Sequence, residues 1–185
     1  ANSRPAANSP WFNAICPHEP YCWGYDYDHT RLATQNYIDQ VNRYWVETYN
    51  IDGFRFDYTK GFVNNGNGYS MERINLLKRM ADEIWTYKSD AYVILEHWCD
   101  NAEEEQLADH GMMLWGNVTH GYQQALMGFT NSSNISSGIY TNRGWSVPHL
   151  ISYAESHDEE RTMFEALTYG NNTNAAHNAR NLYTA

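Results

Sequence analysis

Short apolar segments that alternate with amphipathic helices constrain this chain more than any other feature of its sequence. Strand-like segments are expected at residues 51–57, 92–96, 112–116 and 150–154, and a segment with helical character follows each. Parallel strands require a crossover connection of this kind. The alternation therefore predicts an α/β fold with a parallel sheet, whose active groups lie at the carboxyl ends of the strands.

Apolar side chains spaced three and four residues apart predict the helices. In a helix over residues 31–49 the expected buried face carries Ile38, Val41, Trp45 and Tyr49. Ser70 is expected to open a second helix, with a buried face of Ile74, Leu77, Met80 and Ile84. Further helices are expected near residues 102–109, 120–128 and 159–169.

Residues 1–30 show no sustained period and are rich in proline, so they predict a long loop. The loop contains Cys16 and Cys22, and the third cysteine is Cys99. Three cysteines are too few for a disulfide framework or a paired Cys-x-x-Cys zinc site. Either Cys16 and Cys22 pair across the loop, or all three are reduced and serve as small apolar residues, which is the interpretation we favour.

The net charge of -10 and the absence of a basic stripe argue against sequence-independent binding of nucleic acid, which rests on lysine and arginine. A membrane span is not predicted, because the sequence contains no run of about 18 apolar residues. The first ten residues have neither a basic nor an apolar region, so we expect no signal peptide there.

Ionisable residues stand at the ends of three of the predicted strands. In IDGFRFDYTK, strand alternation places Arg55 and Asp57 on one face, where the guanidinium would keep the carboxylate ionised and oriented. In YVILEHW, Glu96 follows three aliphatic residues, and an apolar setting would raise its pKa as a general acid requires. For both, a purely structural salt bridge is the alternative.

The last predicted strand is followed by a cluster of polar residues that begins at Glu155. Glu159 and Glu160 fit the first turn of the next helix, where acidic groups complement the helix dipole. His157 and Asp158 remain as candidates for function, although Asp158 could instead be an ordinary helix N-cap. Two or more carboxylates at successive strand ends are what a retaining glycosidase needs, about 5 to 5.5 Å apart.

At these residues the sequence closely resembles the α-amylase family, glycoside hydrolase family 13. The second family signature matches Gly53, Phe54, Arg55, Asp57 and Lys60. The third matches the strand that ends at Glu96, and the fourth matches His157 and Asp158. The order and separations fit barrel strands four, five and seven, with MMLWG as strand six.

The resemblance implies a role for each matching residue. Asp57 would be the nucleophile, Glu96 the general acid and base, and Asp158 a third catalytic residue that binds sugar hydroxyls. Arg55 would orient Asp57. The remaining substrate-binding residues would be Lys60, His97, Trp98 and His157.

Two departures from the family concern calcium and the first signature. A histidine that follows the signature lysine in many amylases, and supplies a calcium ligand, is replaced by Gly61. The first signature is not found, since Asp28 and His29 do not match it. No cofactor is expected for the chemistry, structural calcium is conceivable, and the metal ligands are unknown because most family ligands lie outside this chain.

The resemblance covers nearly the whole chain but about half of a family catalytic domain. A complete (β/α)₈ barrel usually has about 250 residues, so residues 1–185 are expected to form a partial barrel covering strands four to seven. Residues 1–30 would be the exit of the insertion after strand three, and residues 31–185 the β/α units. Four strands leave unpaired edges, so self-association is expected to complete the barrel.

The expected activity is hydrolysis of α-1,4-glucosidic bonds in starch-like α-glucans or maltooligosaccharides. The alternatives are a truncated, weakly active or inactive carbohydrate-binding fragment, and a related transglycosylase or debranching enzyme. Neither nucleic acid nor a membrane is expected as a partner. A polymeric substrate favours an extracellular or cell-surface location, whereas maltooligosaccharides would suit a cytoplasmic enzyme.

Overall fold

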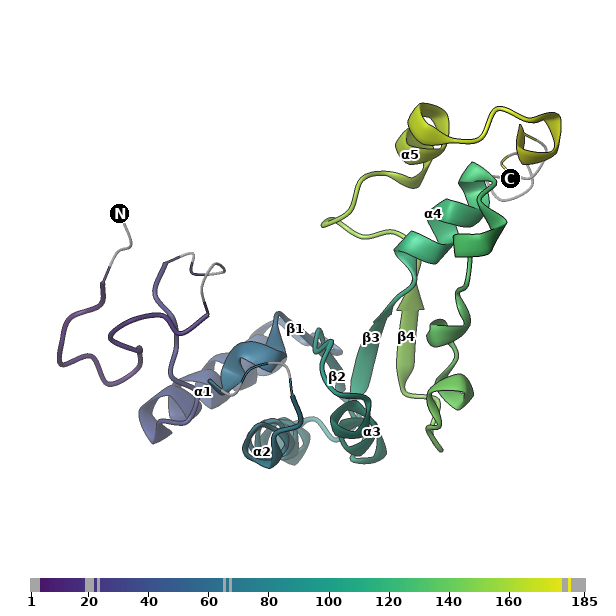
Figure 1. Ribbon diagram of the computed structural model, residues 1–185. Coiled ribbons are helices and arrows are strands. Elements are labelled where there is room, and N and C mark those ends of the chain that lie inside the picture. Colours follow the sequence, from purple (N-terminus) through teal and green to yellow (C-terminus); the bar gives the residue numbers. More distant parts are fainter. Residues whose placement is uncertain are drawn as a thin grey trace. The chain divides into compact units, whose positions relative to one another are not determined.

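The computed structural model describes residues 4–18, 22, 24–64, 66, 68–177 and 180, and its elements are labelled in Figure 1. The chain divides into two compact units, residues 1–114 and 115–185. Each is described by itself.

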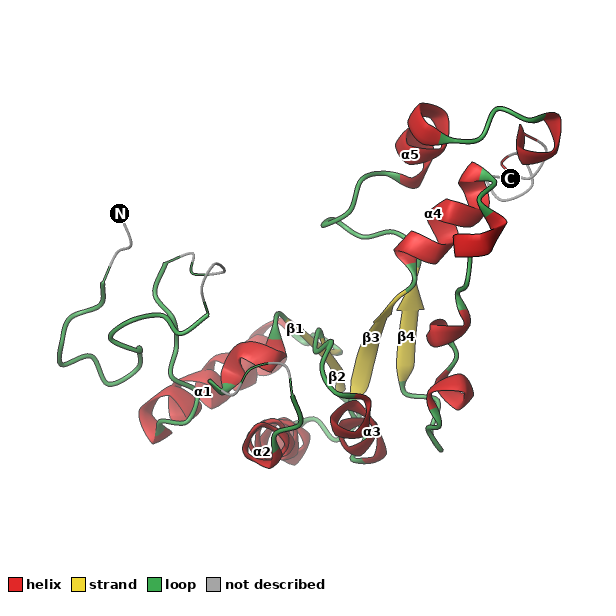
Figure 2. Ribbon diagram, viewed as in Figure 1, coloured by secondary structure: helices red, strands yellow, loops and turns green. Residues whose placement is uncertain are grey.

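Four short strands form one sheet in the order β1-β2-β3-β4. The strands are β1 (Gly53–Phe56), β2 (Tyr92–Leu95), β3 (Met113–Asn117) and β4 (Leu150–Tyr153), drawn as arrows in Figure 2. β2 pairs in parallel with β1 on one side and β3 on the other. The predicted α/β fold with a four-stranded parallel sheet is confirmed, with β3 running across the boundary of the units.

The first unit contains the helices α1 (Leu32–Tyr49), α2 (Met71–Tyr87) and α3 (Asn101–Asp109). Ser70 is the N-cap of α2, as predicted, and its hydroxyl accepts a hydrogen bond from the Arg73 N–H. The expected apolar face of α2 is buried, with Leu77 fully inaccessible to solvent.

The predicted buried face of α1 is wrong for its aromatic residues. Trp45 is 46% exposed and Tyr49 is 56% exposed, whereas Thr34, Asn42 and Val46 are buried. Asn42 and Val46 each come one position after a predicted residue, which corresponds to a rotation of about 100° around the helix. The prediction selected the aromatic residues because they are hydrophobic. In the structure, a threonine and an asparagine are buried on this helix instead.

The approach of β1 to β2 explains why glycine occupies position 53. A Cβ atom built on Gly53 would lie 2.2 Å from the main-chain oxygen of Tyr92, far inside any contact distance. Gly53 and Tyr92 are also partners in the strand register. The absence of a side chain at this position therefore allows the two strands to pair.

The loop that precedes α1 contains a disulfide bond between Cys16 and Cys22, with Cα atoms 5.9 Å apart. The interpretation that all three cysteines are reduced is therefore wrong, and the alternative pairing is correct. Cys99 is free. The two cysteines are close because the loop folds back on itself, with Phe12 and Tyr27 in an isolated antiparallel bridge.

The second unit contains α4 (Thr119–Met127) and α5 (Thr162–Tyr169), separated in sequence by three short 3-10 turns and by β4. A small core joins Leu126 and Met127 to Ala166. α5 was expected to begin at residue 159 but begins at Thr162, whose N–H donates to the carboxylate of Glu155 at 2.9 Å. In the described part of the chain no helix is both long and apolar enough to cross a membrane.

The buried face of α2 generates a stability prediction. Replacing the fully buried side chain in Leu77→Ala leaves a cavity and is expected to cost about 2 to 5 kcal/mol of unfolding free energy. Leu32→Ala, at a position that is 69% exposed, is the matched control and should cost less than about 0.5 kcal/mol. Urea denaturation followed by circular dichroism measures both, and equal losses would contradict the assigned core.

Candidate active site

The register of β1 on β2 brings Asp57 and Glu96 to the same level of the sheet. Phe56 pairs with Leu95, so the two carboxyl residues each come one position later, at the carboxyl ends of neighbouring strands. The ladder continues into this position, since the Glu96 N–H donates to the Phe56 carbonyl at 3.0 Å. Parallel pairing therefore juxtaposes two residues that are 39 positions apart in the sequence.

Arg55 connects the two carboxyl groups. One terminal nitrogen of its guanidinium donates to Asp57, and the other donates to Oε2 of Glu96 at 2.7 Å. The two acids differ in exposure, because the Asp57 side chain is 76% exposed and that of Glu96 only 7%. The structural salt bridge that was the alternative to function is thus present, and it spans both acids.

The main chain after β1 also turns toward Glu96. Tyr58 has a left-handed backbone with φ of 46°, which is strained for a residue with a side chain. This conformation directs its N–H to Oε2 of Glu96 at 3.0 Å. Trp98, two residues after Glu96, has a similar φ of 47°. Backbone strain therefore occurs in both segments that carry the carboxyl pair.

The environment of Glu96 raises the pKa of its carboxyl group. Burial is the largest cause, and a hydrogen bond with Asp57 acts in the same direction. The N–H of Tyr58 and the charge of Arg55 oppose the increase but do not cancel it. The direction of the pKa shift that the sequence predicts for Glu96 is therefore present, and burial is its main cause.

Three further candidates follow the two acids closely in the sequence and differ in burial. The ammonium of Lys60 lies 5.2 Å from the centre of the Tyr58 ring. Trp98 is half-buried, whereas His97 is completely buried. The His97 ring is hydrogen-bonded to Thr59 and Glu103 in the interior. It therefore does not face a substrate surface, although the family resemblance implied that it would. Strand alternation explains this, because successive side chains point to opposite faces.

His157 and Asp158 lie in the second unit, after β4. Both are exposed, and Nε2 of His157 is 3.4 Å from Oδ1 of Asp158. Asp158 is not the N-cap of α5, because Arg161 occupies that position. Glu159 does not belong to the first helical turn either, because α5 begins at Thr162, and the Glu159 carboxylate accepts from Asn117 and Ser156. The structure therefore brings Arg55, Asp57 and Glu96 together in the first unit, whereas His157 and Asp158 belong to the second.

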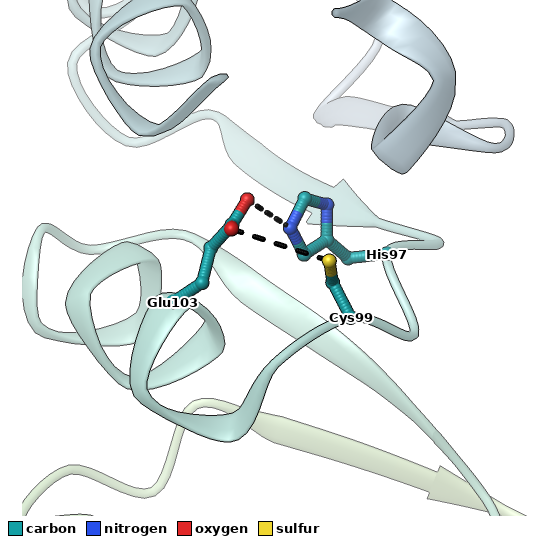
Figure 3. Close-up of side chains that lie close together, drawn as sticks. All are labelled: His97, Cys99 and Glu103. Atoms are coloured by element: carbon teal, nitrogen blue, oxygen red, sulfur yellow. Dashed lines mark hydrogen bonds and ion pairs between the residues drawn. The ribbon is translucent and has the colours of Figure 1, made fainter. Parts of the chain in front are cut away.

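A second cluster, which the sequence did not predict, lies behind the carboxyl pair. His97, Cys99 and Glu103 converge in the first unit, and Figure 3 shows their side chains pointing toward one another. Nε2 of His97 is 2.9 Å from Oε1 of Glu103, and the Cys99 sulfur is 4.0 Å from Oε2. Histidine, cysteine and glutamate all serve as ligands of zinc in proteins, so the residue types alone would suit a zinc site.

The guanidinium of Arg73 already supplies the positive charge that a metal ion would bring to this cluster. Its Nε donates to Oε1 of Glu103 at 2.6 Å and its Nη2 to Oε2 at 2.9 Å, and both side chains are completely buried. Nη2 is also 2.8 Å from the Cys99 sulfur. The cluster is therefore a buried ion pair with added hydrogen bonds, and an ion there would have to displace Arg73.

Glu103 is held ionised in this setting. Burial by itself raises its pKa, but hydrogen bonds from His97, Arg73 and the Ser70 N–H outweigh burial and lower the pKa to about 2. The sequence predicted a helix near residues 102–109, which contains Glu103, but no partner for this carboxylate. Its main partner, Arg73, is 30 positions away on another helix, so no local pattern could have revealed it.

Comparisons with known proteins give a likeness in fold. No family model matches the chain, and no curated protein matches it. Among solved structures the chain is similar to Eubacterium rectale Amy13B, with a TM-score of 0.51 and 19% sequence identity. The match covers 88% of this chain and 30% of Amy13B, so the chain spans less than a third of that protein.

The ionised state of Glu103 predicts how stability depends on pH. Its pKa is about 2 in the folded protein and near the ordinary value of 4.5 when unfolded, so stabilisation is complete above that value. About 3 kcal/mol is expected to be lost as the pH falls from about 5 to 2. Urea denaturation of the protein and of Glu103→Gln should therefore differ most at pH 7 and converge at low pH.

Glu105→Gln, which removes an acidic charge elsewhere on α3, is the matched control for this experiment. Identical curves of stability against pH for Glu105→Gln and Glu103→Gln would contradict the assigned role of Glu103.

Proposed function

We propose that this chain carries the catalytic carboxyl pair of a retaining glycoside hydrolase of the α-amylase type, acting on α-1,4-linked glucans. The observation that carries the proposal is the arrangement of Asp57 and Glu96 on adjacent strands, joined by Arg55. An ion pair with only a structural role would need one carboxylate. The second carboxyl group, buried and with a raised pKa, supplies an acid beside a nucleophile.

The environments of the two acids suit the two roles. Asp57 is exposed and contacts a guanidinium, which favours the ionised form that attacks the anomeric carbon. Glu96 is buried and favours the protonated form, which donates its proton to the glycosidic oxygen as the bond to that oxygen breaks. Glu96 then accepts a proton from water, and that water releases the sugar from Asp57.

The closeness of the pair supports the retaining mechanism. Asp57 and Glu96 both contact the guanidinium of Arg55, at the ends of paired strands. An inverting enzyme separates its carboxyl groups by about 6.5 to 9.5 Å, so that water fits between sugar and base. Two acids that contact one guanidinium fit the closer spacing of a retaining enzyme, in which one carboxylate attacks the sugar directly.

Glucan as the substrate class rests on the family signatures around Asp57, Glu96 and Asp158, and on the fold shared with Amy13B, whose name marks an amylase. We further propose that Lys60, Trp98, His157 and Asp158 bind the sugar. The proposed chemistry takes place between two carboxyl groups and water, and therefore calls for no cofactor. Structural calcium, and self-association that completes the barrel, stay predictions.

An extracellular or cell-surface location is part of the proposal. The disulfide between Cys16 and Cys22 supports it, because such bonds persist mainly in oxidising compartments. A polymeric glucan would also be met outside the cell.

The central test is hydrolysis of a blocked maltooligosaccharide by the protein and by its variants. Glu96→Gln is expected to lower kcat more than about a hundredfold, because proton donation is lost. Asp57→Asn should lower it at least as strongly, since the amide does not attack. Asp52→Asn, with its side chain 87% exposed just before β1, is the matched control and should retain full activity.

Failure of the two variants to reduce hydrolysis would refute the assignment of roles. Glucan binding measured by calorimetry without release of reducing sugar would instead indicate a carbohydrate-binding module, and transfer of glucosyl groups to a second sugar would indicate a transglycosylase.

An activated substrate separates the two roles. Fluoride leaves α-maltosyl fluoride without needing a proton, so Glu96→Gln should form the glycosyl-enzyme from this substrate at nearly the normal rate. Asp57→Asn should be inactive on both substrates. Stopped-flow measurement of fluoride release checks this, and equal defects of Glu96→Gln on both substrates would rule out Glu96 as the acid.

A further inference from the structure

Four buried side chains form a continuous hydrogen-bonded chain that begins in α2 and ends at Glu96. Arg73 donates to both carboxylate oxygens of Glu103, and Oε1 of Glu103 is 2.9 Å from Nε2 of His97. On the other side of the ring, Nδ1 is 2.9 Å from the hydroxyl of Thr59. All four residues are completely buried.

Thr59 links this chain to the proposed acid. Its hydroxyl donates to the main-chain carbonyl of Glu96 at 3.1 Å, and its N–H donates to the same oxygen at 2.9 Å. Thr59 also follows Tyr58 directly, and the Tyr58 N–H donates to the Glu96 carboxylate. A shift of Thr59 would therefore move both the peptide that carries Glu96 and a donor to its carboxyl group.

The opposite end of the chain anchors the loop after β1. The guanidinium of Arg73 donates to the carbonyls of Lys60 at 3.1 Å, Gly66 at 3.0 Å and Gly68 at 2.8 Å. This loop contains Lys60, a proposed substrate contact. One buried cation therefore fixes the loop through its main chain and fixes Glu103 through its carboxylate.

The energetic cost of this arrangement argues that it does more than fill space. Removing two charges from water costs several kcal/mol per ion, and apolar side chains of similar volume often serve stability equally well. Directional bonds, in contrast, specify where each group lies to within a few tenths of an ångström. Every bond in the chain lies on a path that ends at Glu96 or at the loop of Lys60.

We propose that Arg73, Glu103, His97 and Thr59 are positioning residues that hold the carboxyl group of Glu96 against the Tyr58 N–H and Asp57. The inference rests on the proposed function for the catalytic meaning of Glu96, but the positioning itself is a statement about geometry. His97, which immediately follows the acid, acts from behind it and not from the substrate side.

The test reads the Glu96 carboxyl group directly. Its ¹³C signal, assigned by its absence in Glu96→Gln, is followed as a function of pH in the protein and in Thr59→Val, which removes the hydroxyl at nearly constant shape. In this variant the Tyr58 N–H is expected to move away from the Glu96 carboxylate, which disfavours the ionised form of Glu96. The titration midpoint of Glu96 should therefore rise by about half a pKa unit or more. Thr59→Ser keeps a hydroxyl and should restore the original midpoint.

Leu77→Ala is the matched control, since it destabilises the first unit through the apolar face of α2 without removing a member of the chain. Its midpoint should equal that of the unaltered protein. His97→Gln is a second variant, in case Thr59→Val fails to fold, and should shift the midpoint in the same direction. Unshifted midpoints in the folded variants would overturn the inference.

Activity separates this inference from the proposed function. Thr59→Val is expected to lose about tenfold or more of kcat on a maltooligosaccharide and little on α-maltosyl fluoride, whose leaving group needs no proton. Absence of hydrolysis by the unaltered protein would refute the proposed function, while the titration would still decide the positioning. Equal losses on both substrates would overturn a role that acts through the acid.

Discussion

The guanidinium of Arg55, placed between two carboxyl groups, is the interaction on which the proposed chemistry depends. Without it, Asp57 and Glu96 would repel each other at the ends of adjacent strands, and the buried acid would bear an uncompensated charge. With it, both carboxyl groups contact a positive charge, and Arg55 opposes the increase that burial causes in the pKa of Glu96. The difference in exposure between the two acids, and not the shared cation, is what sets their environments apart.

A second guanidinium, that of Arg73, is completely buried and also binds a carboxylate. It neutralises Glu103 and donates hydrogen bonds to three main-chain carbonyls of the loop after β1. The cost of burying it is offset by bonds that satisfy both carboxylate oxygens, as a buried ion pair requires. The strained backbones of Tyr58 and Trp98 are found between these two networks, where the surrounding bonds can maintain them.

Much of the site could be predicted because strand ends obey simple rules. Alternation along β1 places Arg55 with Asp57, and an apolar strand before Glu96 implies burial and a raised pKa. The family resemblance placed His97 at the substrate, and no local pattern shows that its neighbours are Thr59 and Glu103. Sequence reasoning also failed for α1, where periodicity identified a helix but selected the wrong row as its buried face.

The sequence by itself determined the alternation of strands and helices, the cap at Ser70 and the acids at the strand ends, because these depend on residues close together in the chain. Only the tertiary structure decided that Cys16 pairs with Cys22, that Arg55 also reaches Glu96, and that Arg73 neutralises Glu103. Arg55 and Glu96 are 41 positions apart in the sequence, and Arg73 and Glu103 are 30 positions apart. Such contacts depend on strand register and helix packing, and these are fixed only when the elements are assembled.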